Sequence, residues 1–185
     1  MSEGRGPASY QDVLNAPDDR IAEIVSGELF LSPRPAIRHA RISSILGGHL
    51  VPAFDSGISG PGGWWILFEP ELHLGADVLV PDLAGWRRER LAALPDQAAM
   101  TVTPDWVCEV LSPATAAMDR ERKLPLYAKY EVESAWLIDA KRRSLEVYVR
   151  ESGGWRVAAV HDDRVPLRAY PFDAVAIDLR ALWID

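Results

Sequence analysis

Two carboxylates in this sequence occupy positions where an acidic residue is costly without a cation. Asp82 follows Pro81 at the end of the apolar run at 78–80, and Glu109 interrupts the apolar run at 106–111. A buried ionised carboxylate is unfavourable unless a cation pairs with it, and Mg²⁺ accepts one or two protein carboxylates together with water and phosphate oxygens. If the two runs are neighbouring strands, the sheet fixes the spacing of the carboxylates. We therefore expect Asp82 and Glu109 to bind Mg²⁺ or Mn²⁺.

Lys123 could complete such a site as a cation that does not bind the metal. It follows Glu109 in a stretch with helical character. There it could orient a water molecule or neutralise negative charge that develops on a phosphate. Taken singly, Asp82 is an ordinary turn residue after a proline, and Lys123 is a solvated surface lysine. Glu109 carries more weight, because a charged side chain is rarely buried without a partner.

A histidine and two arginines form a second group of candidates. His39, Arg38 and Arg41 lie close together on a predicted helix, where they could contact a phosphate or a water molecule. A structural or surface role explains His39 equally well. The other common site patterns are missing: the four histidines have no helical i, i+4 pairing, and there is no HExxH motif and no glycine-rich phosphate loop. Cys108 precedes Glu109 and is expected on the opposite face of its strand, so a catalytic thiol is not supported.

The composition fits one domain over residues 1–185, with 48% hydrophobic and 25% charged residues. The longest apolar stretches fall short of the roughly 20 residues that span a bilayer. No apolar run follows Met1, so we expect neither a secretory signal nor membrane association. A single cysteine permits no intramolecular disulfide, which fits a reducing, cytoplasmic compartment.

The net charge of −7 has the wrong sign for a protein that coats nucleic acid non-specifically. A nucleic-acid partner must therefore meet a local basic patch. The arginines that could supply one are Arg34, Arg38 and Arg41, then Arg87, Arg88 and Arg90, then Arg120 and Arg122.

The elements that must position these residues follow from hydrophobic spacing and turn residues. Helices are predicted over 9–17, 35–54, 87–94 and 114–130, and strands over 21–25, 28–31, 64–74, 78–86, 106–111, 135–138, 145–149 and 155–160. A last strand and a short helix are expected within 175–184. Trp64, Trp106 and Trp136 fall in strand patterns and are predicted to be core residues. This order predicts an α/β or α+β layered domain.

The ordered set of motifs resembles the Uma-type restriction endonucleases, a branch of the PD-(D/E)XK nuclease superfamily. The resemblance runs from about Tyr10 to Tyr148. It depends on the following motifs: Glu23 with Ser26-Gly27-Glu28-Leu29, residues 33–39, Val80-Pro81-Asp82-Leu83, Pro104-Asp105, Glu109 to Thr115, Asp119, Lys123-Leu124, Tyr127-Ala128 and Ala135 to Asp139.

The resemblance implies a restriction-endonuclease-like core, with a mixed central sheet flanked by helices and extra antiparallel strands. Asp82 would match the family's motif aspartate, Glu109 its motif glutamate, and Lys123 a displaced motif lysine. Glu28 would match a position that approaches the metal through water, although a hairpin glutamate is more often solvated. The same two interpretations apply to Glu23. Two residues depart from the pattern: Leu111 occupies the usual lysine position, and Pro125 interrupts the helix that carries Lys123.

These features together predict a metal-dependent phosphodiesterase that acts as a DNA endonuclease. The alternative is a non-catalytic protein that keeps the nuclease fold and acts as a nucleic-acid-binding or assembly module. A homodimer is also expected, because the apolar segments at 155–160 and 175–179 exceed what one layer of helices covers.

Overall fold

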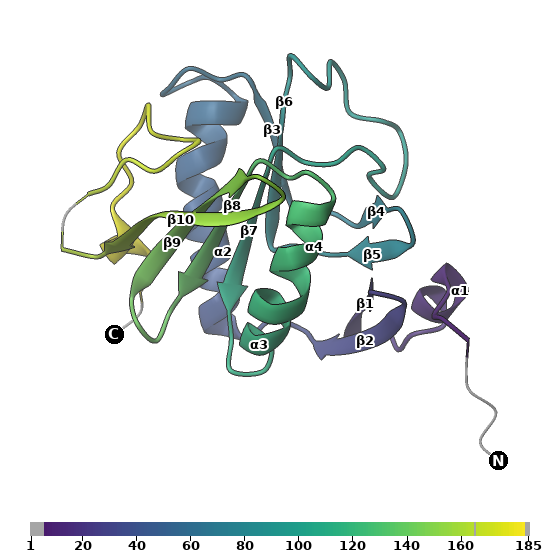
Figure 1. Cartoon of the computed structure of the whole chain (residues 1–185). Helices are drawn as coiled ribbons and strands as arrows, with labels where there is room; N and C mark the ends of the chain where they lie inside the picture. Colours follow the sequence, from purple (N-terminus) through teal and green to yellow (C-terminus); the bar gives the residue numbers. More distant parts are fainter. Residues whose placement is uncertain (1–5, 165, 184–185) are drawn as a thin grey trace.

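Two β-sheets and four helical segments make up the computed structural model, which describes residues 6–164 and 166–183 (Figure 1). The helical elements are α1 (Tyr10–Leu14), α2 (Ile37–Leu50), the π-helical η1 (Val51–Asp55), α3 (Ala116–Met118), the π-helical η2 (Asp119–Lys123), α4 (Leu124–Lys129) and the 3₁₀ helix η3 (Leu179–Leu182). The strands are β1 (Arg20–Val25), β2 (Glu28–Pro33), β3 (Trp64–Phe68), β4 (Leu72–Leu74), β5 (Asp77–Leu79), β6 (Leu83–Arg87), β7 (Trp106–Leu111), β8 (Ser134–Asp139), β9 (Ser144–Glu151) and β10 (Gly154–Asp162). No helix of the described residues is both long and apolar enough to cross a bilayer.

The larger sheet is mixed and has the strand order β10-β9-β8-β7-β6-β3. Only the pair β7–β8 is parallel within it, and α3, η2 and α4 form the crossover between these two strands. The smaller sheet, in the order β2-β1-β5-β4, is antiparallel. The predicted mixed sheet with extra antiparallel strands is therefore confirmed.

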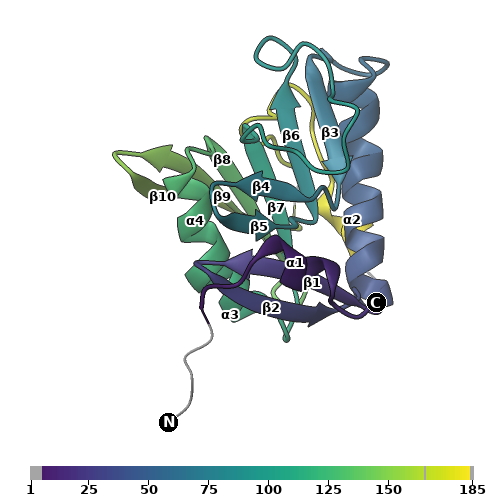
Figure 2. The ribbon, with the colours of Figure 1, turned by 90° about the vertical axis from the view of Figure 1, so that its right-hand side faces the viewer.

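Helices cover both faces of the larger sheet (Figure 2). α2 packs against β3 and β7 on one face, where Trp106, Cys108 and Val110 join the core cluster that includes Leu46 and Leu50. α4 covers the opposite face, where Val107 and Leu111 pack in a second cluster. Alternation along β7 thus divides its side chains between two cores, and it places Glu109 on the α4 side and Cys108 on the α2 side.

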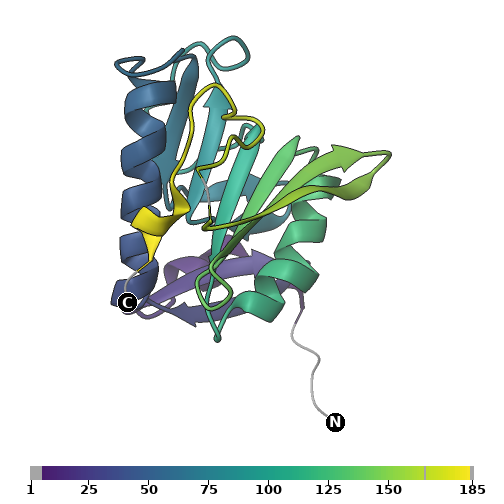
Figure 3. The same cartoon turned by 90° about the vertical axis from the view of Figure 1, so that its left-hand side faces the viewer.

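Three predicted core tryptophans are confirmed. Trp64, Trp106 and Trp136 are buried, and their rings surround Phe172 at centroid distances of 4.9, 4.8 and 5.6 Å. Phe172 comes from the C-terminal segment, which closes this core from the side of α2 (Figure 3).

The prediction of one continuous strand over 78–86 is wrong. It divides into β5, in the smaller sheet, and β6, in the larger sheet, with residues 80–82 passing between them. Pro81 has no N–H to give to a ladder, and the Val80 N–H donates to a carboxylate oxygen of Glu23 at 2.7 Å. The strand predicted over 64–74 divides in the same way, at Glu69, whose φ is 45°, and Pro70.

The short helix predicted over 87–94 is also wrong. Arg87 continues β6, opposite Trp64, and a turn follows. The Arg90 guanidinium donates to Asp105 at 2.9 Å, and the Trp65 indole donates to the Leu91 carbonyl at 2.9 Å, so tertiary contacts hold this loop. The predicted strand near 175–179 is reduced to one bridge between Leu167 and Ile177, and η3 supplies the terminal helix. Ile184, at the end of that prediction, and residues 1–5, where a secretory signal was sought, lie outside the described residues.

Candidate active site

A cavity of about 260 Å³ lies between β1, the start of α2, the link from β5 to β6, the end of β7 and the α3–η2 helix. Its polar lining residues are Glu23, Ser32, Arg34, His39, Asp82, Glu109, Ser112, Thr115, Asp119 and Lys123. Asp82, Glu109, Lys123 and His39, all named from the sequence, therefore line one cavity.

Asp82 is held by two different elements. It stands directly before β6, which pairs antiparallel with β7 so that Leu83 faces Cys108. One carboxylate oxygen, Oδ2, accepts the Val110 N–H at 2.7 Å, and Oδ1 lies 2.6 Å from His39 Nε2. The carboxylate is thus fixed between the backbone of β7 and a side chain of α2.

Glu109 lies at the buried end of the cavity and is 4% exposed. Its Oε1 accepts the Tyr127 hydroxyl at 2.6 Å and lies 2.9 Å from the Lys123 ammonium. Both donors come from the crossover helix, since Lys123 ends η2 and Tyr127 lies in α4. Both contacts fall on Oε1, which leaves Oε2 as the oxygen that can face a ligand in the cavity.

Lys123 is buried and makes its polar contacts entirely within the protein. Its Nζ lies 2.8 Å from Glu23 Oε1 and 2.9 Å from Glu109 Oε1, and it donates to the Val80 carbonyl at 3.1 Å. The π-helical turn that ends at Lys123 precedes Pro125, which stands in the first turn of α4 and needs no hydrogen-bond partner for its nitrogen. The helical segment therefore continues from Ala116 through Lys129, with a π-helical turn directly before the turn that holds the proline.

The carboxylates of the cavity raise one another's proton affinity. Burial raises the pKa of Glu109 well above its usual value; the Lys123 charge opposes this, and the charges of Asp119 and Asp82 add to it. Burial likewise raises the pKa of Asp119 to about 6, against the opposing charge of Lys123. Burial and the neighbouring carboxylates therefore favour the protonated forms of Glu109 and Asp119 when no cation is bound.

The two cationic groups of the cavity respond in the opposite sense. Burial lowers the pKa of Lys123, but the charges of Glu109 and Glu23 outweigh it and the net pKa is raised well above the usual value. For His39, burial again lowers the pKa, and the hydrogen bond and charge of Asp82 raise it to a larger extent. The surroundings thus favour the protonated forms of both Lys123 and His39.

The donor set of the cavity fits a hard divalent cation. Glu23, Asp82, Glu109 and Asp119 supply only oxygen donors. Among the described residues, no three His, Cys, Asp or Glu side chains form a ready cluster around one point. A site of two carboxylates, Asp82 and Glu109, suits Mg²⁺, which commonly keeps several waters and takes oxygens from a phosphate.

Three predicted site residues lie elsewhere. Glu28 is exposed and pairs with Arg122 at 3.0 Å, because the turn at Ser26-Gly27 carries it to the end of the hairpin. Arg38 lines a different cavity, and Arg41 is an exposed residue of α2. The structure therefore does not bring Glu28, Arg38 or Arg41 into contact with the carboxylates.

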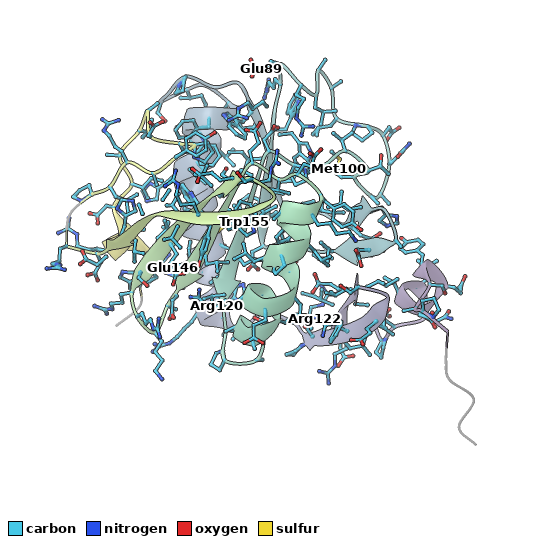
Figure 4. All side chains as sticks on the ribbon, in the orientation of Figure 1. Glu89, Met100, Arg120, Arg122, Glu146 and Trp155 are labelled. Atoms are coloured by element: carbon cyan, nitrogen blue, oxygen red, sulfur yellow. The ribbon has the colours of Figure 1, made fainter. Side chains whose placement is uncertain are left out.

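Most of the predicted basic groups are neutralised inside the protein. Two guanidinium nitrogens of Arg120 donate to the two carboxylate oxygens of Glu146, each at 2.7 Å. Figure 4 labels both side chains. The arginines that pair with carboxylates are Arg87 with Glu133, Arg88 with Asp55, Arg90 with Asp105, and Arg122 with Glu28. Arg34, which donates to the Asp18 carbonyl, is the arginine of the original groups that lines the candidate active site.

Sequence reasoning assigned no site role to Asp119 or Tyr127, and it left Glu23 between a site role and a solvated one. Glu23 and Asp119 lie beside the Lys123 ammonium, and the Tyr127 hydroxyl donates to Glu109. The available signal was the spacing of Asp119, Lys123 and Tyr127, which puts all three on one face of a helix at intervals of four residues.

The comparisons with known proteins agree with this fold. A structural match is the crystal structure of a protein from Anabaena variabilis described as a "putative nuclease", with a TM-score of 0.77 and 18% sequence identity, covering 96% of this chain and 98% of that chain. That match confirms the nuclease-type fold. No curated protein matches the sequence. The family model described as "Putative restriction endonuclease" matches residues 7–179, and the chain therefore belongs to this family, Uma2.

Proposed function

We propose that this protein is a metal-dependent endonuclease that hydrolyses phosphodiester bonds in DNA. The observation that carries the proposal is the convergence of Asp82 and Glu109, from adjacent strands, on one cavity in which Lys123 is buried against Glu109. Membership of a family described as restriction endonucleases supports the nuclease class.

Asp82 and Glu109 would hold Mg²⁺ or Mn²⁺, which polarises a phosphate and lowers the pKa of a bound water. The protein's own groups prepare the site. The Val110 N–H and His39 hold the Asp82 carboxylate, and Tyr127 and Lys123 hold the Glu109 carboxylate. The same ammonium places a fixed positive charge at the bottom of the cavity, where it would stabilise negative charge that grows on the phosphate.

His39 and Arg34 stand where the DNA backbone would enter. Arg34 is exposed and lines the cavity beside His39. Its guanidinium can donate to phosphate oxygens in a fork, as arginine commonly does. The positive charge that offsets the acidic protein is therefore local to the start of α2.

A non-catalytic binding module remains the second candidate, and one observation favours it. The Lys123 ammonium has three protein acceptors, at Glu23, Glu109 and Val80, so its contacts resemble those of a structural ion pair. On this interpretation the cavity would bind nucleic acid without cutting it.

We also propose that the protein assembles as a homodimer. β10 is an edge strand of the larger sheet, and its Val157 and Val160 are 51% and 64% exposed. An exposed edge strand with apolar side chains is suited to pairing with a second copy.

A cleavage assay tests the function directly. Single-stranded DNA, duplex DNA, branched DNA and RNA are each incubated with the protein in Mn²⁺, in Mg²⁺ and in excess chelator. The proposal expects cleavage of DNA that stops when the chelator is added. Binding without cleavage in any of these conditions would favour the non-catalytic module.

A further inference from the structure

A second cavity, also of about 260 Å³, lies on the other side of the α2 N-terminal turn. Its charged lining residues are Arg38, from α2, and Lys141 and Arg143, from the turn between β8 and β9. Trp183, which follows η3, and the buried Leu182 close it from the C-terminal segment. We call this the basic cavity.

The basic cavity and the candidate active site open at the same edge of the larger sheet. β7 and β8 are parallel, with Leu111 opposite Asp139, so the loops that follow them leave the sheet side by side (Figure 1). The loop after β7 lines the active-site cavity, and the turn after β8 lines the basic cavity. Successive residues of α2 face the two cavities: His39 lines the first and Arg38 the second.

Two of the three cations of the basic cavity have no carboxylate partner among the described residues. Arg38 and Lys141 are exposed, and neither has a carboxylate partner among residues 6–164 and 166–183. Arg143 lies 3.8 Å from Asp163. By contrast, Arg87, Arg90 and Arg120 are each paired with a carboxylate. The basic cavity is thus one place where the acidic protein presents positive charge without a carboxylate partner.

Trp183 lines the basic cavity together with these cations. Two cationic side chains at one cavity suit an anion with several oxygens, and a phosphate group provides them.

We infer that the basic cavity binds a backbone phosphate of the duplex DNA whose scissile phosphate lies in the neighbouring active-site cavity. This inference rests on the proposed function for its choice of ligand. Phosphate contacts of this kind set the position of a duplex without reading its sequence. Arg38 and Lys141 would therefore fix the register of the DNA across the active site.

The test measures binding and not cleavage. The dissociation constant of a fluorescein-labelled duplex is determined by anisotropy in Ca²⁺, over a range of salt concentrations, for the wild type, Lys141→Gln and Lys129→Gln. Lys129→Gln is the matched control: it removes the same charge from an exposed lysine of α4 that lines neither the basic cavity nor the candidate active site.

Lys141→Gln is expected to bind the duplex about tenfold more weakly, because it loses one charged hydrogen bond. The slope of log K against log salt concentration should become less steep by about 1. Lys129→Gln should match the wild type in both quantities. An Arg38→Gln, Lys141→Gln double variant should lower the slope by about 2.

The outcomes separate this inference from the proposed function. If the wild type cuts DNA and Lys141→Gln binds with an unchanged salt slope, the inference is overturned and the nuclease stands. If the wild type binds DNA through Lys141 but never cuts it, the inference stands and the nuclease fails. If the wild type binds no duplex at low salt, the basic cavity is not a phosphate site.

Discussion

The Lys123 ammonium lies 2.9 Å from Glu109 Oε1, although the two residues belong to different elements of the chain. Lys123 reaches Glu109 from η2, across the face of β7 on which Glu109 lies. Leu111, two residues after Glu109, occupies the position where the resembling nucleases usually carry a lysine, and here it is buried in the apolar cluster under α4. The positive charge of the site therefore comes from the helix, and the strand position contributes to the core.

Removal of Lys123 should destabilise the fold as well as affect activity. Lys123→Met leaves Glu23 and Glu109 buried without their cation, and breaking a buried ion pair in this way typically costs about 3–5 kcal/mol. The additional change Glu23→Gln removes one of the two stranded charges and should restore part of the loss. Urea unfolding of the single and double variants measures both effects. Equal stability of Lys123→Met and the wild type would show that the ion pair is not formed in solution.

A divalent cation should stabilise the wild type. Without a metal ion, the negative charges of Asp82 and Glu109 repel each other. A cation that binds only the folded protein raises the free energy of unfolding by roughly 2.7 kcal/mol when its concentration is a hundredfold above its dissociation constant. Differential scanning fluorimetry with Mn²⁺ should show a rise in Tm for the wild type and none for Asp82→Asn. A wild-type Tm that does not change with Mn²⁺ would count against the metal site.

The sequence placed the main members of this site but not their partners. Asp82, Glu109 and Lys123 could be named because acidic residues within apolar runs stand out, and because the ordered motifs resemble a nuclease family. The hydrogen bonds that fix them could not be named. The Tyr127–Glu109 contact and the Glu23–Lys123 contact join elements whose relative position depends on the packing of the whole sheet.

The errors in the fold have the same origin. The apolar pattern at 78–86 continues across residues 80–82, and nothing local shows that the two halves belong to different sheets; the Val80 N–H bond to Glu23 is a long-range contact. The segment 87–94 has helical composition, yet a hydrogen bond from Arg90 to Asp105 and one from Trp65 to Leu91 hold it as a loop. In both segments, tertiary contacts determine the backbone conformation and override the local secondary-structure preference of the sequence.

The contribution of Asp119 to the stability of the metal-free protein should fall as the pH rises from about 4 to about 7. The pKa of Asp119 is raised by burial from 3.8 to about 6, so the folded state holds this proton more tightly than the unfolded chain. Its contribution is fully present below pH 3.8 and is lost as the pH rises through 6. Asp119→Asn cannot ionise, so its stability relative to the wild type should increase over that range, by up to about 3 kcal/mol.

Urea unfolding at several pH values, in the presence of chelator, measures this difference. Asp96→Asn, which changes an exposed loop aspartate, is the control and should follow the wild type. A constant difference in stability between Asp119→Asn and the wild type from about pH 4 to pH 7 would mean that Asp119 ionises normally.

The homodimer proposal predicts a sedimenting species of twice the 20.5 kDa chain mass at micromolar concentration. Val160→Lys, on β10, should shift the protein toward the monomer, because it places a charge at the exposed edge strand. Ile58→Lys alters a residue that is 83% exposed in a loop and should leave the dimer intact. A wild type that sediments as a monomer would reject the dimer.

The most direct test of the metal-dependent nuclease is cleavage of supercoiled plasmid DNA in Mn²⁺ by three proteins: the wild type, Asp82→Asn and Asp96→Asn. Asp82→Asn keeps the shape of the side chain but removes the charge that holds the cation, and Asp96→Asn makes the same chemical change outside the cavity. The wild type and Asp96→Asn should cut at equal rates, and Asp82→Asn should be slower by about a hundredfold or more. Cleavage by Asp82→Asn at the wild-type rate, or no cleavage by the folded wild type with any DNA substrate, would contradict the metal-dependent nuclease.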